Sequence, residues 1–185
     1  MRINGIKDHL RKQKIMGKKS TFSAAFASAL APFDKFDNVS VAEAIRDLGQ
    51  NPERDLNCVY CGDTAATWDH VHRRVIGGEY SGYGHRIRNL VPCCRSCNER
   101  KGKRTWEEWL DVLSPPDIEE RRNNMRRFLS KPSAAPFTVE DMRRAAPREL
   151  SEFLEIRQEV FRLMKKADDL ADVIRETAIK AHSAR

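Results

Sequence analysis

Two Cys-x-x-Cys pairs constrain this chain more than any other feature of its sequence. They are Cys58 with Cys61 and Cys94 with Cys97, and residues 62–93 separate them. Each pair presents two thiolates from one tight turn, and four thiolates complete the tetrahedral coordination of one zinc ion. Such a site has no open position for water or substrate, so the spacing indicates structural zinc. We therefore expect the chemistry to belong to residues that the zinc holds in place.

Three further motifs lie between and just after the cysteine pairs: Trp68-Asp-His-Val71, Arg88-Asn-Leu-Val-Pro92 and Cys97-Asn-Glu-Arg-Lys-Gly102. Together with the four cysteines they resemble the HNH endonucleases of the zinc-supported ββα-metal type, over roughly residues 54–104. The last position of that pattern is often His; here it is Asn98, which offers an oxygen ligand instead of a nitrogen. The resemblance implies an α+β fold, with a small zinc-bound ββα-metal core flanked by α-helices at both ends.

The resemblance also assigns roles to four side chains. His70 is the general base, since a neutral imidazole can take a proton from water near neutral pH. Asp69 points to the opposite side of the strand from His70. With Asn98 it offers oxygen ligands to one hard cation, Mg²⁺, for which Mn²⁺ can substitute. Asn89 orients the adjoining loop and the His70 ring.

The charge of the chain favours a polyanionic partner. Its 185 residues carry a net charge of +7, and Lys or Arg side chains placed on phosphates release counterions on binding DNA. A solvated basic surface is the plain alternative. The candidate contacts to double-stranded DNA are Arg73, Arg74, Arg86, Arg88, Lys101 and Lys103. His72 and His85 are weaker candidates for touching phosphate or metal, and are otherwise surface histidines of a loop.

Composition also indicates a compartment. No apolar run reaches membrane-spanning length, and no continuous apolar segment follows the basic amino terminus, which argues against a secretory signal. Four of the five cysteines have metal-binding spacing, which suits a reducing cytoplasm better than a disulfide framework. The fifth, Cys93, is interpreted as a buried or incidental thiol. The three tryptophans, Trp68, Trp106 and Trp109, are assigned to the core.

Three regions are expected: a basic arm with helices over 1–50, the nuclease core over 51–113, and a helical region over 114–185. The arm, rich in Lys and Arg over residues 1–20, is either a solvated tail or a segment that follows a phosphate backbone. Capping and periodicity predict helices starting near residues 21, 40, 96, 105, 117, 138 and 147, and a strand that ends at His70. The helix from Ser96 is expected to run past Lys101.

The final helix, over 147–181, carries an apolar stripe with a seven-residue period, which a coiled-coil seam requires. Its members are Phe153, Ile156, Val160, Leu163, Ala167, Leu170, Ile174 and Thr177. The stripe either packs on the amino-terminal helices of the same chain or forms a homodimer. The dimer is favoured, because two copies would cut both strands of a palindromic site.

The function expected from these features is a divalent-metal-dependent DNA endonuclease. A type II restriction enzyme is favoured over a phage or mobile-element nicking enzyme, because the short chain shows no separate DNA-binding module. A non-catalytic zinc module that binds nucleic acid is the alternative from another class. It is disfavoured because Asp69, His70, Asn89 and Asn98 are all present together.

Overall fold

The computed structural model describes residue 10 and residues 12–183, which form two compact units. The terminal unit comprises residues 1–26 with 143–185, and the central unit comprises residues 27–142. The boundaries expected after residues 50 and 113 both fall inside the central unit. Arg2, Lys7 and Arg11 of the expected basic arm lie outside the described residues. Helices and short strands confirm the α+β class.

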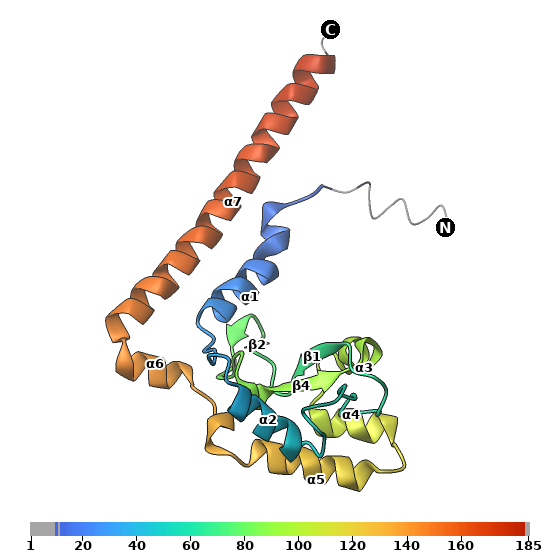
Figure 1. Ribbon diagram of the computed structural model, residues 1–185. Coiled ribbons are helices and arrows are strands. Elements are labelled where there is room, and N and C mark those ends of the chain that lie inside the picture. Colours follow the sequence, from blue (N-terminus) through green and yellow to red (C-terminus); the bar gives the residue numbers. More distant parts are fainter. Residues whose placement is uncertain (1–9, 11, 184–185) are drawn as a thin grey trace. The chain divides into compact units, whose positions relative to one another are not determined.

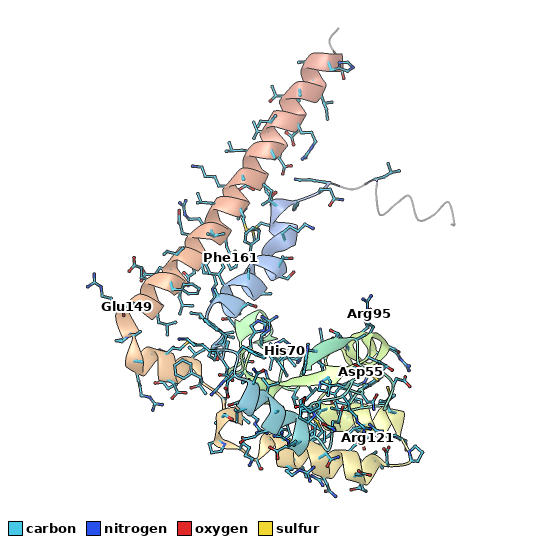
Figure 2. All side chains as sticks on the ribbon, viewed as in Figure 1. Asp55, His70, Arg95, Arg121, Glu149 and Phe161 are labelled. Atoms are coloured by element: carbon cyan, nitrogen blue, oxygen red, sulfur yellow. The ribbon has the colours of Figure 1, made fainter. Side chains whose placement is uncertain are left out.

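The terminal unit pairs the start of α1 (Lys19–Ala29) with α7 (Pro147–Ser183), and the two segments run in opposite directions. The ring of Phe26 lies 5.4 Å from that of Phe153, and the Lys19 ammonium lies 5.2 Å from the centre of the Phe161 ring. Figure 2 shows Phe161 between the two helices. One turn of 3-10 helix, η2 (Ile15–Lys18), precedes α1. Its first two N–H groups, of Ile15 and Met16, donate to the carboxylate of Asp168.

The predicted stripe of α7 is therefore split along its length. Phe153, Val160 and Ala167 are half-buried on the covered side of the helix. The other five members of the stripe are exposed: Ile156, Leu163, Leu170 and Ile174, which are about half exposed or more, and Thr177. Packing within the chain, one of the two alternatives raised by the sequence, accounts for one edge of the stripe and leaves the other edge uncovered.

The ββα element of the central unit is built from β1 (Thr67–His70), β4 (Leu90–Cys93) and α3 (Arg95–Lys101). The strands are antiparallel, and His70 pairs with Leu90. His70 ends β1, as predicted. Between the strands lie β2 (Val75–Ile76), β3 (Glu79–Tyr80) and the 3-10 helix η3 (Ile87–Asn89). The turn from β2 to β3 uses Gly77 and Gly78, both with positive φ, which glycine adopts without steric cost.

Helices α2 (Asn38–Asp47), α4 (Trp106–Leu113) and α5 (Ile118–Leu129) enclose this element. A 3-10 turn, η4 (Pro132–Ala134), and then α6 (Val139–Ala145) follow α5 in the chain. Figure 1 shows α5 running along α2 and α4. The core between them contains Tyr60, Trp109, Leu110, Met125 and Phe128 together with buried cysteines. Cys58, Cys94 and Cys97 therefore belong to the hydrophobic core of this unit, and Cys61 packs against it.

Local signals placed the helix ends within a few residues, and two of the differences have a clear cause. The capping box of Thr105 with Glu108 is confirmed at the start of α4. Helix α2, however, begins before Ser40, because the carboxylate of Asp37 accepts the Ser40 N–H and is the N-cap. Helix α3 does not run past Lys101, because Gly102 takes a φ of 55° and ends it.

Two of the three tryptophans assigned to the core are buried: Trp106 is 4% exposed and Trp109 is 2% exposed. Trp68 is 47% exposed, so its assignment to the core is wrong. It lies on a two-stranded sheet, one face of which is open beside it.

Among the helices of the described residues, none combines the length and apolar character needed to cross a membrane.

Candidate metal centre and catalytic site

The four cysteines in metal-binding spacing form one cluster. Their Sγ atoms all lie within 4.8 Å of one another, and those of Cys61 and Cys94 are 3.7 Å apart. A regular tetrahedron with Zn–S bonds of about 2.3 Å has edges of about 3.8 Å, so the spacing fits four-coordinate zinc. Cys94 is also the N-cap of α3, and its Sγ accepts the N–H of Cys97. The cluster thus ties the turn at Cys58 to the start of α3.

Two neighbours stabilise this cluster without belonging to it. Arg121, on α5, donates to the backbone carbonyls of Cys58 and Val59 at 3.3 and 3.2 Å. The fifth thiol, Cys93, is fully buried and its Sγ lies 3.9 Å from that of Cys58. The hydrogen bond with Cys58, followed by burial, raises the pKa of Cys93. Cys93 is therefore a neutral buried thiol, in agreement with its interpretation from the sequence.

Asp69 and His70 project from opposite faces of β1, as the alternation of a strand requires. The carboxylate of Asp69 is buried, and its Oδ2 accepts a 2.7 Å hydrogen bond from the Tyr60 hydroxyl. Lys101 Nζ lies 3.1 Å from the same oxygen and also donates to the backbone carbonyl of His70. Lys101 is only 1% exposed. Its expected contact with DNA phosphate is therefore wrong: the side chain balances the charge of Asp69.

Asn98 lies on α3, beside the strand that carries Asp69. Its Nδ2 donates to Thr67 Oγ1 and to the Trp68 carbonyl, both at 3.4 Å. Within the described part of the chain, neither Oδ1 of Asn98 nor Oδ1 of Asp69 accepts a hydrogen bond. These two oxygens come from the strand and helix of one ββα element, and they are the type of donor that a hard divalent cation takes. The donor set therefore fits the expected cation.

His70, which is labelled in Figure 2, joins a chain of three side chains with His85 and Arg74. Its Nε2 lies 3.2 Å from Nδ1 of His85, and Nε2 of His85 lies 2.8 Å from an Arg74 nitrogen. Because a guanidinium can only donate, His85 Nε2 accepts, and the His85 proton sits on Nδ1 and is donated to His70. The lone pair of His70 Nε2 is therefore the acceptor, and both rings are neutral.

The surroundings favour the neutral form of His70. Burial first, then the positive charge of Arg74 and the neighbouring His85 and Lys101, lower the pKa of His70 to about 4. Burial and Arg74 also lower the pKa of His85. A ring with this pKa is almost entirely a proton acceptor at neutral pH, which is the form that a general base requires.

Asn89 closes the loop that carries Arg74 and His85. Its Oδ1 accepts the His72 N–H at 2.8 Å, and its Nδ2 donates to the carbonyls of His72 and Gly84 at 2.9 Å. The side chain is buried and binds both ends of the loop, so it is positioned for the orienting role that we expect of it. None of these hydrogen bonds is to the His70 ring.

Comparison with known families bears on this segment directly. Residues 58–104 match the family model described as HNH endonuclease. The chain contains an HNH endonuclease domain. The match spans about a quarter of the chain and extends from the first clustered cysteine to just beyond α3. Neither the curated proteins nor the solved structures that were searched gave a match to the chain.

The basic residues expected at DNA have different positions in the HNH domain. Arg88 is buried, pairs with Asp47 at 2.6 Å and donates to the Phe128 carbonyl, so its expected phosphate contact is wrong. Arg86 pairs with Asp34. Lys101 pairs with Asp69, as described above. The other three candidates are not held in an ion pair by the described residues: Arg73, Arg74 and Lys103.

Arg73 and Lys103 line one cavity of about 290 Å³ with His72 and Arg104. The His72 ring stacks on Tyr83 at 4.1 Å between centroids. The lining thus combines three cations with one carboxylate, that of Glu107. Arg73 and Lys103 therefore remain candidate DNA contacts.

Sequence reasoning missed two functional features of the HNH domain. It placed His85 on the surface of a loop, where the ring is indeed exposed, but it did not anticipate that His85 contacts the proposed base. It also did not anticipate the hydroxyl of Tyr60 on Asp69. His85 is 15 residues from His70 across a loop without regular periodicity, so no spacing rule connects them. The one indication in the sequence was that His85 lies four residues before Asn89, which closes the loop and so brings this part of the chain back toward His70.

Proposed function

We propose that the protein is a DNA endonuclease that hydrolyses phosphodiester bonds with the help of a divalent cation. The observation that carries this proposal is the neutral His70 at the end of β1, beside a strand and helix that offer free oxygens of Asp69 and Asn98. Zinc in the four-cysteine cluster is proposed to be structural, and Mg²⁺ is proposed at the two oxygens.

His70 is proposed to take the proton of the attacking water on Nε2. In the absence of substrate this lone pair accepts the His85 N–H, and the water replaces that hydrogen bond in the complex. Asn89 keeps the loop and His85 in place, while Tyr60 and Lys101 fix the orientation of the Asp69 carboxylate. A cation bound by Asp69 and Asn98 would supply positive charge for the phosphate and the leaving oxygen.

Incubation with supercoiled plasmid tests the proposal directly. Relaxed or linear product is expected with Mg²⁺ or Mn²⁺, and no product is expected with EDTA or when the divalent cation is omitted. Omission is the milder control, because EDTA can also remove zinc. Plasmid that stays supercoiled with every divalent cation would favour the alternative, a zinc module that binds nucleic acid without cutting it.

Asn98→Ala is expected to separate the two metals. The variant should keep its zinc and its fold, because Asn98 makes only two long hydrogen bonds and lies outside the cysteine cluster. Cleavage at limiting Mg²⁺ should fall by at least about tenfold, and added Mg²⁺ should restore part of it. Glu99→Ala, at the next and exposed position of α3, is the matched control and should behave like the wild type. Equal Mg²⁺ dependence in the two variants would contradict the ligand assignment.

The acid limb of the pH profile is a further expected result. Since His70 is neutral above its lowered pKa of about 4, cleavage should persist below pH 6.5, the usual value for His, and fall only as pH approaches 4. Arg74→Gln removes a charge that lowers the pKa, so it should move the acid limb upward. Arg73→Gln is the matched control: it can weaken DNA binding but should leave the midpoint unchanged. Zinc content is measured at each pH, because acid also releases zinc from thiolates.

We propose that the protein acts as a homodimer in a restriction context, with the uncovered edge of α7 as the contact. Ile156, Leu163 and Leu170 repeat every seven residues, and a second copy of the same edge would bury them. Two copies related by a two-fold axis would cut both strands of a palindrome. A nicking enzyme from a phage or mobile element is the competing context.

Leu163→Glu with Leu170→Glu should convert the dimer to a monomer and change double-strand cutting to nicking. Both side chains are about half exposed, so the charges are tolerated within one chain. Ser151→Glu with Gln158→Glu adds the same charge at exposed positions of α7 outside the stripe, and should leave the dimer intact. Light scattering measures the mass. A wild-type mass of 21.3 kDa at all micromolar concentrations would exclude the dimer.

A further inference from the structure

An apolar cavity opens beside the proposed base, on the same face of β1. Trp68 precedes His70 by two residues, so the two side chains share that face. The cavity has a volume of about 300 Å³, and its lining is predominantly apolar. Trp68 and Phe36 are its aromatic members, and Val41, Ala44 and Leu90 are among its aliphatic members.

His85 joins this cavity to the catalytic site. Its ring lines the cavity, and its Nδ1 lies 3.2 Å from Nε2 of His70. Whatever phosphodiester His70 serves must therefore lie next to the cavity mouth. The nucleotides attached to that phosphate are the groups of the substrate that can reach the cavity, since each carries a base within one sugar of the phosphate.

We propose that this cavity binds one unpaired nucleobase of the DNA strand that is cut. The inference rests on the proposed nuclease function and adds a substrate feature to it. A nucleobase has two flat apolar faces, which stack on aromatic side chains whatever the base sequence. Phe36 and Trp68 provide such side chains, and the volume is at the small end of ligand pockets, which span about 300–1,000 Å³.

The charges around the cavity suit a nucleotide better than an apolar peptide side chain. The rim carries one carboxylate, Asp34, and both of its oxygens are engaged, by Arg86 Nε and by the Ile87 N–H. Lys35, exposed on the same rim, adds a positive charge. An anionic backbone therefore meets no free carboxylate on the rim and has a cation available there.

A base in a regular duplex is stacked and cannot enter the cavity unless it is extruded. Extrusion costs least where the base is mismatched or already single-stranded. The cavity thus implies a preference for DNA with unpaired bases near the cut, such as mismatched, bulged or single-stranded segments.

Tryptophan fluorescence provides a direct test, because Trp68 is exposed while Trp106 and Trp109 are buried. The full-length protein is titrated without divalent cation with a short single-stranded oligothymidylate. The parallel titration uses an oligonucleotide of equal length in which every base is replaced by an abasic analogue. Stacking on Trp68 is expected to quench the emission with the first probe and not with the second. Trp68→Phe keeps an aromatic wall and should lose the signal, which identifies its source.

Phe36→Ala is expected to weaken binding of oligothymidylate by at least about fivefold, the loss typical of a removed base stack. Phe33→Ala is the matched control, because Phe33 is 76% exposed and Phe36 is 78% exposed, in one loop, but only Phe36 lines the cavity. Neither substitution removes a buried side chain, so both proteins should fold. Phe36→Ala should also remove the preference for cutting a mismatched over a fully paired duplex.

Equal quenching by the normal and abasic probes would overturn the proposal, and so would equal affinities of the Phe36 and Phe33 variants for oligothymidylate. Plasmid cleavage by the wild type reports separately on the nuclease. If the protein cuts plasmid but shows no base-dependent quenching, the proposed nuclease function stands and the proposed base-binding role of the cavity fails. If it shows base-dependent quenching but no cleavage, the base-binding role stands and the nuclease function fails.

Discussion

His70→Ala is expected to reduce DNA cleavage by about 10²- to 10⁴-fold, the usual contribution of a general base. Zinc content, fold and DNA affinity should stay close to those of the wild type. The ring makes one hydrogen bond, to His85, and is not part of the hydrophobic core. The structural contact of this residue is its backbone carbonyl, which accepts from Lys101 and is unchanged by the substitution.

Three measurements separate the role in proton transfer from a role in structure. The rate of plasmid cleavage at saturating Mg²⁺ gives the size of the loss, and binding of a DNA duplex without Mg²⁺ gives the affinity. Added imidazole should restore part of the activity of His70→Ala, because it can occupy the space of the missing ring. His182→Ala, at the exposed end of α7, is the control for the loss of a histidine. Cleavage by His70→Ala within tenfold of the wild type would exclude His70 as the base.

The sequence predicted the parts of this structure that depend on local interactions. The four-cysteine cluster follows from spacing, because a Cys-x-x-Cys turn presents two thiolates whatever the rest of the chain does. The start of α4 follows from Thr105 and Glu108, which cap each other across one turn. The end of β1 at His70 and the start of α7 at Pro147 were likewise visible in short stretches of sequence.

The features that the sequence did not predict depend on contacts between distant residues. Lys101 has the spacing of an exposed helix position, but the neighbouring Asp69 carboxylate draws it into the core, where it is nearly inaccessible. Trp68 has a large aromatic side chain, which is typical of a protein core, but the side of the sheet that it occupies is only partly covered. Charge pairing and the extent of packing decided these cases, and neither leaves a periodic signal in the sequence.

The same argument applies to α7. A seven-residue apolar period shows that part of the helix is buried, but not by which partner. The antiparallel segment around Phe26 covers one edge of the stripe, including Phe153, and the edge with Leu163 stays open. The sequence therefore raised both alternatives, packing within the chain and dimerisation. One stripe can serve both, because a single neighbouring helix covers only one of its two edges.

Loss of one zinc ligand is expected to unfold the central unit. Cys58→Ser and Cys97→Ser should each lose zinc and the cooperative unfolding transition of that unit. Three of the four cysteines lie in its hydrophobic core, among residues such as Tyr60 and Trp106, and Cys61 packs against it, so we expect the metal site and the core to form together. Structural zinc contributes about 10–16 kcal/mol of apparent binding free energy in small zinc domains. That exceeds or equals the whole stability of a typical domain, about 5–15 kcal/mol.

Cys93→Ser is the matched control for both variants. Cys93 is as buried as Cys58 and lies 3.9 Å from it, yet its thiol is outside the cluster of four. A serine hydroxyl there can still donate to the Cys94 carbonyl, as the thiol does. Metal analysis should give one zinc per chain for the wild type and Cys93→Ser, and well below one for the other two variants, with circular dichroism reporting the fold. Unchanged zinc in Cys58→Ser and Cys97→Ser would exclude the four-cysteine site, whereas zinc loss in Cys93→Ser would mean that the fifth thiol is a ligand.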